Sequence, residues 1–305
     1  MKIQWYPGHM HKAAREMRAA LAGVDVVVEL LDARLPFSSA NPMLAELRRD
    51  KPVIRVMTRA DLADPARTEV WTDWYRKGHQ GKSLAVSARR PAEVKRIVGL
   101  CSAGFPRRPD PVVAMVAGIP NVGKSTVINI LAGRSVAKTG NEPAITKRQQ
   151  RVAVGDGVVL LDTPGVLWPN VENAHSGFRL AVTGAIRETA ISHVEIAMYL
   201  AGFLVAQYPG PMADRYALDA GLAGGEAILE ALGRSRGCLG RGGVVDMDRA
   251  ARILLNDFRA GHLGGITLET PEMIEDELRE VAKERAARAA KKAARKQGKS
   301  GPGSA

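Results

Sequence analysis

The chain has 305 residues, few cysteines and aromatic residues, and no long apolar run. Its two cysteines, Cys101 and Cys238, are far apart and match no metal-ligand spacing, so we expect two free thiols in a reducing cytoplasm. Aromatic residues make up only 5% of the chain, so the core must rest on Val, Leu, Ile and Ala. The longest apolar stretch, residues 196–207, is too short to span a bilayer. The N-terminus lacks a signal peptide's apolar segment, and no lipid-anchor motif is present, which argues against a membrane role.

Positive charge is unevenly distributed. The net charge is +12, and residues 279–299 alone hold nine Lys or Arg against two Glu, a net of +7. Concentrated positive charge suits a polyanionic partner, because neutralised phosphates release counterions. The alternative is a solvated, Ala-rich helix that only aids solubility.

Short apolar stretches alternate with amphipathic ones over the first 167 residues. Near-continuous apolar strands separated by helices predict a mostly parallel, doubly wound α/β sheet covered on both faces. The predicted strands are 24–32, 53–58, 83–87, 112–118, 150–154 and 158–162, and the predicted helices are 12–22, 42–49, 65–77, 91–101 and 124–131.

The pattern changes after residue 170. Helical periodicity dominates from there, most clearly over 193–206, 248–260 and 272–296, and Gly-rich turns separate the helices. We therefore predict three parts. These are an α/β domain with an N-terminal arm (1–168), an all-helical domain (169–278) and a basic tail (279–305).

Residues 118–125, GIPNVGKS, fit the phosphate-loop pattern G-x-x-x-x-G-K-[ST]. A predicted strand precedes the loop and a predicted helix follows it, as the motif requires. The glycines let backbone N–H groups point at phosphates, and the helix N-terminus adds partial positive charge. Lys124 is expected to reach the β- and γ-phosphates, and Ser125 to bind Mg²⁺.

Three further stretches favour GTP over ATP. Residues 162–165, DTPG, follow an apolar strand, so Asp162 is expected to hold Mg²⁺ through water and the Gly165 N–H to contact the γ-phosphate. Residues 58–61, TRAD, resemble the guanine-specifying Asn-Lys-x-Asp of GTPases, and Ser87-Ala88 resembles the loop that backs the guanine O6. In ordinary GTPases the phosphate loop comes first. Here the guanine-reading stretches precede it, so the predicted order is circularly permuted.

This order, together with four stretches, resembles the ribosome biogenesis GTPase A family of bacterial large-subunit assembly factors. The stretches are residues 4–10 (QWYPGHM), 29–34 (ELLDAR), 162–169 (DTPGVLWP) and 242–251 (GGVVDMDRAA). The last is similar to that family's helical RNA-contacting domain. Three positions depart from the family pattern. Thr58 replaces Asn, which predicts the loss of one bond toward the base or the phosphate loop. Arg59 replaces Lys, and Ala144 replaces Gly.

The resemblance and the motifs together imply a set of site residues. Thr146 resembles the threonine that ligates Mg²⁺ when GTP is bound. The expected nucleotide-binding residues are Thr58, Arg59, Asp61, Ser87, Ala88, Asn121, Val122, Gly123, Lys124, Ser125, Thr126 and Gly165; Ser125, Thr146 and Asp162 are expected at Mg²⁺, and Asn121 at K⁺.

Hydrolysis needs charge neutralisation and a positioned water. Lys124 can supply charge, but Val166 and Leu167, which follow Gly165, cannot orient water through their side chains. By analogy with the family's N-terminal histidine, His9 is the candidate for that role; the alternative is a helix cap or an RNA contact. Asn121 resembles the asparagine that holds K⁺ in related GTPases, or it is a loop residue bonded to its own backbone.

The resulting expectation is a cytoplasmic, monomeric GTPase that binds GTP or GDP with Mg²⁺ and K⁺. The resemblance implies that it contacts the large ribosomal subunit and its rRNA, that it assists late assembly, and that the ribosome stimulates its hydrolysis. One alternative is a nucleotide-gated RNA-binding scaffold with negligible turnover. A third reading, a GTPase for tRNA modification, is opposed only by the resemblance.

Overall fold

A six-stranded sheet forms the centre of the molecule. The computed structural model describes residues 6–78, 81–106, 109–137, 150–186, 191–218 and 221–299. The strand order is β3-β2-β1-β4-β6-β5, and every pairing is parallel except β5 with β6. The strands are β1 (Val26–Asp32), β2 (Val53–Thr58), β3 (Lys82–Ala85), β4 (Val112–Gly118), β5 (Gln150–Ala153) and β6 (Val158–Asp162).

The sheet confirms the predicted doubly wound α/β class. All seven residues of β1 and all six of β2 are buried, which explains why their sequences are almost continuously apolar. The chain runs outward from β1 to β3 and then returns to place β4 on the other side of β1. In open α/β sheets, ligands bind at the carboxyl ends of the strands beside such a reversal. The reversal here is the boundary between β1 and β4.

Five α-helices accompany these strands close to their predicted positions. α1 begins at Gly8, four residues earlier than predicted, and buries Met10, Ala13 and Met17 against the core. α4 and α5 both pack on β4 and β6. The helices are α1 (Gly8–Ala20), α2 (Pro42–Arg48), α3 (Pro65–Gly78), α4 (Pro91–Ser102) and α5 (Lys124–Ala132), with short 3₁₀ turns η1 (Leu21–Gly23) and η2 (Ala60–Leu62).

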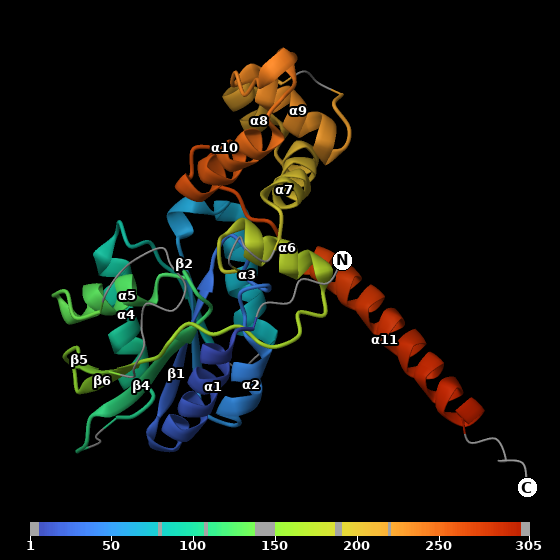
Figure 1. Cartoon of the computed structure of the whole chain (residues 1–305). Coiled ribbons are helices and arrows are strands. Elements are labelled where there is room, and N and C mark those ends of the chain that lie inside the picture. The colour runs from blue at the N-terminus through green and yellow to red at the C-terminus, as the bar shows by residue number, and fades with distance from the viewer. Residues whose placement is uncertain are drawn as a thin grey trace, which may run out of the picture.

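A helical bundle lies apart from the sheet (Figure 1). Its central helix, α7 (His193–Gln207), packs against α8 (Pro209–Tyr216), α9 (Gly225–Ser235) and α10 (Met247–Ala260). The short turn η4 (Arg241–Gly243) precedes α10, and α6 (Ala174–Val182) lies between bundle and sheet. The sequence pattern did not predict α6, α8 or α9. Each contains glycine or proline, which weakens the helical signal of the sequence.

After α10 the chain returns to the α/β part through residues 263–270, here called the return strap. Leu268 N donates to Arg34 O at 2.7 Å, and Ile266 N donates to Leu62 O at 3.1 Å. The next helix, α11 (Pro271–Lys299), buries Ile274 in a cluster with Trp71 and Tyr75 of α3. The strap and the first turns of α11 thus pack on the α/β part. The boundaries predicted at residues 168 and 278 stay predictions.

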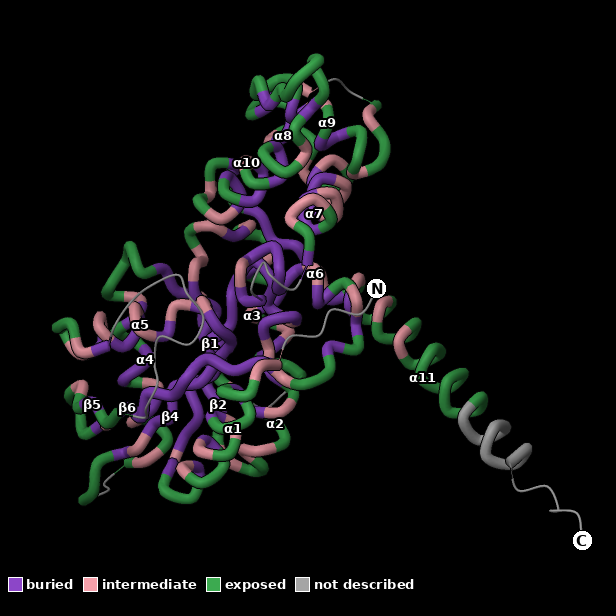
Figure 2. Tube along the Cα trace, viewed as in Figure 1, coloured by how far each residue is buried: buried purple, intermediate pink, exposed green. Residues whose placement is uncertain are grey.

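Beyond its first turns α11 projects away from the molecule (Figure 1), and Figure 2 shows most of its described length exposed. No helix among the described residues combines the length and apolar character needed to cross a bilayer.

Candidate functional site

The phosphate loop lies at the carboxyl end of β4, beside the reversal of strand order. Asn121 (φ 59°) and Gly123 (φ 99°) adopt left-handed conformations that curl the loop, and α5 begins directly at Lys124. The buried Lys124 Nζ donates to the carbonyls of Gly118 (3.1 Å) and Ile119 (2.8 Å). Burial lowers the pKa of Lys124 to about 8, although Asp162 opposes the shift. The loop therefore holds one buried cationic group at a helix N-terminus, as a phosphate site requires.

Asp162 ends β6 next to this loop. Its Oδ1 is buried and has no hydrogen-bond partner among the described residues. Burial raises the pKa of Asp162 to about 6, opposed by Lys124 and by the Thr163 N–H. A buried carboxylate oxygen without a protein partner is a suitable ligand for Mg²⁺ or for its bound water. Ser125, the other predicted Mg²⁺ ligand among the described residues, lies in the first turn of α5. The unpartnered Asp162 oxygen fits the ion.

Gly165 lies directly against the phosphate loop. A Cβ at this position would lie 2.9 Å from Lys124 Nζ and 2.9 Å from Pro120 Cα, so the close approach requires glycine. The next two side chains, Val166 and Leu167, are each 1% exposed and belong to the core. They therefore point away from solvent. No side chain directly after Gly165 can orient a water, as the sequence predicted.

Thr58, at the end of β2, contacts the phosphate loop directly. Its Oγ1 lies 2.6 Å from Val122 O and 3.0 Å from Leu31 O. A hydroxyl has one proton to donate, and the shorter contact favours Val122. The expected loss of a bond was therefore wrong for the phosphate loop, because the shorter threonine still reaches it. Arg59 adopts a left-handed conformation (φ 58°), and its Nη2 donates to Asn121 O at 2.7 Å.

The two stretches predicted to read guanine meet at the ends of β2 and β3. The buried Ser87 Oγ donates to Asp61 Oδ1 at 2.7 Å. The exposed Arg89 lies 3.3 Å from Asp61 Oδ2, and Ala88 between them is exposed. The fold thus brings Asp61 and Ser87 together beside the phosphate loop, although 26 residues separate them.

The remaining predicted residues lie in different parts of the structure. Asn121 Nδ2 donates to Gly184 O at 2.7 Å, in the segment that follows α6. His9 lies exposed in the first turn of α1. Val122 is buried in the loop, Thr126 follows Ser125 in α5, and Thr146 lies outside the described residues. The nucleotide-binding, metal-binding and catalytic roles of all the predicted residues stay predictions.

The sequence did not predict a network of ion pairs beneath these loops. Arg34 forms a two-bonded pair with Asp32 (2.9 and 2.7 Å), and its guanidinium lies over the Phe258 ring of α10, 5.2 Å from the centroid. Asp32 also lies 3.8 Å from Arg59 Nε. These contacts join the bundle to the loop after β2 that is predicted to read guanine. Asp32 and Arg34, two residues apart at a strand end, were visible in the sequence, but Phe258 is distant and gave no signal.

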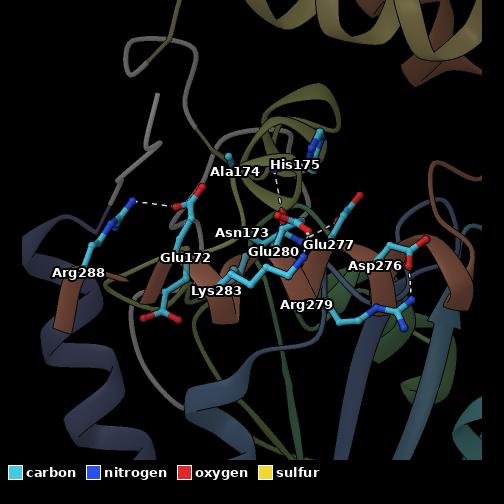
Figure 3. Close-up of a pocket in the computed structure, with 12 residues that line it drawn as sticks. Glu172, Asn173, Ala174, His175, Asp276, Glu277, Arg279, Glu280, Lys283 and Arg288 are labelled. Atoms are coloured by element: carbon cyan, nitrogen blue, oxygen red, sulfur yellow. Dashed lines mark hydrogen bonds and ion pairs between the residues drawn. The ribbon is translucent and has the colours of Figure 1, made fainter. Parts of the chain in front are cut away.

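A pocket opens beside α6 and α11, away from the phosphate loop (Figure 3). Its lining mixes acidic residues such as Glu172 and Glu280 with basic ones such as Lys283. Within it, Asn173 Nδ2 donates to Glu277 Oε2 at 2.7 Å, so the segment before α6 is bonded to α11.

The chain is similar to known proteins over most of its length. Residues 113–201 match a family described as 50S ribosome-binding GTPase. Over 294 residues the chain is 40% identical to ribosome biogenesis GTPase A of Bacillus cereus, covering 93% of this chain and 99% of that relative. Two solved structures of YlqF resemble it. A GDP-bound structure has a TM-score of 0.65 and 26% identity, covering 85% of this chain and 100% of its own. A GNP-bound structure from T. maritima has a TM-score of 0.61 and 27% identity, covering 86% and 99%.

Proposed function

The chain belongs to the ribosome biogenesis GTPase A family and hydrolyses GTP, and from that premise we propose that it assists late assembly of the large ribosomal subunit in the cytoplasm as a monomer. The observation that carries the proposal is the extent of the similarity. The matched relative aligns with both the α/β part and the helical bundle. The family description, 50S ribosome-binding GTPase, supports the large subunit as the partner.

In the proposed site, each strand end has a separate task. Lys124 and the loop N–H groups of residues 121–126 bind the β- and γ-phosphates. Asp61 accepts two hydrogen bonds from guanine N1 and N2, which adenine cannot supply, while Ser87 and Ala88 back the O6. Arg59 stacks on the base, and Thr58 ties its strand to the phosphate loop. Ser125, Asp162 and Thr146 would hold Mg²⁺, which would neutralise charge on the transferred phosphate.

Two proposed features of hydrolysis are tested separately. His9 orients the attacking water, and Asn121 holds K⁺ against the phosphates. His9→Ala should lower ribosome-stimulated turnover, and undiminished turnover would remove His9 from the mechanism. For Asn121, turnover in KCl should exceed turnover in NaCl at equal ionic strength, and this difference should vanish in Asn121→Ala.

We propose that the bundle and α11 bind ribosomal RNA. The basic run of α11 projects into solvent, where phosphates can approach it. Removing residues 282–305 leaves Ile274 and Glu277 in place, so the anchoring turns of α11 are kept. The truncated chain should bind large subunits with a flatter dependence of log affinity on log salt. An unchanged slope would remove the tail from the interface.

We further propose that nucleotide state is transmitted to the bundle. Asn121 of the phosphate loop is bonded to Gly184 O, just after α6, and Arg259 of α10 donates at 2.7 Å to the carbonyl of Val182, the last residue of α6. The Phe258–Arg34 contact provides a second path. A conformational change in the phosphate loop can therefore reach the bundle through two hydrogen bonds. Phe258→Ala should weaken the difference in subunit affinity between GDP and a GTP analogue without abolishing GTP binding.

Single-turnover hydrolysis with and without large subunits tests the functional proposal. We expect the subunits to raise the rate markedly. The alternative, a nucleotide-gated RNA-binding scaffold, is favoured by the buried Val166 and predicts negligible hydrolysis in both conditions. Stimulation by tRNA in place of subunits would instead assign the chain to tRNA modification.

A further inference from the structure

Asn41 connects the start of α2 to the segment that follows Gly165. The residue is 3% exposed and forms the N-cap of α2. Its Oδ1 accepts from Met43 N (3.0 Å) and Leu44 N (3.4 Å). Its Nδ2 donates to Val166 O at 3.0 Å, across 125 residues of sequence. One side chain thus performs a local capping task with its oxygen and a long-range task with its nitrogen.

The backbone of Asn41 is itself held in place. Its N–H donates to Glu29 Oε1 at 3.1 Å. Glu29 pairs with Arg55 (3.3 Å), its partner in the β1–β2 register, and Arg55 lies 4.9 Å from the centroid of the Tyr75 ring. All of these groups are buried. Because both sides of the Asn41 amide and its own N–H are bonded, the side chain has a single favourable orientation.

The backbone of residues 165 and 166 is consequently held at several points. Gly165 lies against Pro120 and Lys124 of the phosphate loop. Val166 N donates weakly to Gly118 O at 3.4 Å, and Val166 O accepts from Asn41. Since the Val166 side chain is buried, only the backbone of this segment can face a bound γ-phosphate. Its placement therefore depends on these backbone bonds.

We propose that Asn41 is a positioning residue for GTP hydrolysis: by holding the Val166 carbonyl, it restrains the backbone that carries the Gly165 N–H beside the phosphate loop. The inference rests on the proposed contact of Gly165 with the γ-phosphate. Asn41 does not touch the nucleotide in this account. It acts only by positioning the backbone at Gly165, which does contact the nucleotide. Small displacements of such groups lower the rate of hydrolysis.

Asn173 provides a matched control because it has the same arrangement elsewhere. It forms the N-cap of α6, and its Oδ1 accepts from His175 N (2.9 Å) and Ser176 N (3.4 Å). Its Nδ2 donates to Glu277 rather than to the segment beside the phosphate loop (Figure 3). Replacing either asparagine by serine keeps a hydroxyl cap but removes the long-range donor.

The test compares Asn41→Ser with Asn173→Ser in single-turnover hydrolysis and GDP binding. Asn41→Ser should lower turnover roughly tenfold or more. It should change GDP affinity by less than about twofold, because GDP has no γ-phosphate for Gly165 to contact. Asn173→Ser should retain wild-type turnover. Should Asn41→Ser fold poorly, Asn41→Asp keeps the cap and the length of the side chain but lacks the donor, and it should show the same selective loss.

Two results would overturn the proposal: unchanged turnover in both Asn41 variants, or an equal loss in Asn173→Ser, which would assign the effect to helix capping. Lys124→Ala separates this from failure of the proposed site. If Lys124→Ala loses nucleotide while Asn41 variants hydrolyse normally, only the role of Asn41 is rejected. If Lys124→Ala binds GTP normally, the proposed site itself is wrong.

Discussion

Arg179 in α6 and Arg288 in α11 both pair with glutamates, but their surroundings are opposite. Arg179 is 1% exposed and forms two bonds to Glu277, with Glu269 of the return strap 3.5 Å away. Arg288 pairs with Glu284 one turn earlier at 2.9 Å, and both side chains are more than half exposed. The contacts of Arg179 join α6 to the return strap and the start of α11, and Glu277 lies 98 residues further along the chain. The Arg288–Glu284 pair joins two residues of one helix.

The difference shows how the two regions are specified. Glu269 also accepts from Phe37 N and Ser38 N and from the Ser38 hydroxyl, so the strap is fixed to the loop after β1. Burial alone would lower the pKa of Arg179, but its two carboxylates outweigh burial and raise it. Along α11, pairs such as Lys283–Glu280 only support the helix locally. The buried contacts therefore fix how distant segments pack, whereas the charged side chains of α11 stay exposed to solvent.

The largest expected difference between the buried region and α11 is in nucleotide affinity, when one lysine in each is replaced by alanine. Lys124→Ala should weaken GTP and GDP binding roughly a hundredfold or more, because a buried cation that contacts phosphate contributes about 3 kcal/mol or more. Lys283→Ala, which removes an exposed cation from α11, should leave nucleotide affinity unchanged. Titration with a fluorescent guanine nucleotide measures both. Equal effects of the two substitutions would contradict the separation of tasks.

The buried ion network gives the next largest effect. Arg179→Ala should lower the free energy of unfolding by about 3–5 kcal/mol, because it leaves the carboxylate of Glu269 buried without its cation. Denaturant unfolding of wild type and variant measures the difference. A loss below about 1 kcal/mol would contradict this prediction, because it would equal the contribution of an ordinary surface ion pair.

The pH dependence tests the charges at the phosphate loop. In the free protein the pKa of Asp162 is raised to about 6 and that of Lys124 is lowered to about 8. The binding-competent form, with carboxylate ionised and ammonium protonated, therefore predominates between these values. We expect kcat/KM to fall about tenfold per pH unit outside the window, since one proton is gained or lost on each side. A flat profile from about pH 5 to 9 would argue against the buried pair.

The exposed pairs of α11 give the smallest effect. Arg288→Ala should change the free energy of unfolding by about 0.5 kcal/mol or less, because solvent screens an i,i+4 pair. The same substitution should measurably weaken binding to large subunits at low salt if α11 contacts RNA. A large loss of stability would show that α11 packs more closely than its exposure indicates.

Local signals predicted much of the fold and part of the site. The apolar strands and the phosphate loop each depend on neighbouring residues, and 112–118 and 158–162 were predicted to the residue. Long-range contacts were not predictable. Nothing in the sequence linked Asn41 to Val166, Arg34 to Phe258, or Glu269 to Arg179. Thr58 shows the same limit, since its bond to Val122 depends on how closely the loop approaches β2.

Cosedimentation with large ribosomal subunits tests the central claim most directly. The claim is that the buried site controls how the basic, exposed region engages its partner. The wild-type chain should sediment with subunits in the presence of a non-hydrolysable GTP analogue and be released in GDP, while Lys124→Ala should lose this dependence. Equal retention of the wild-type chain with both nucleotides would contradict the account.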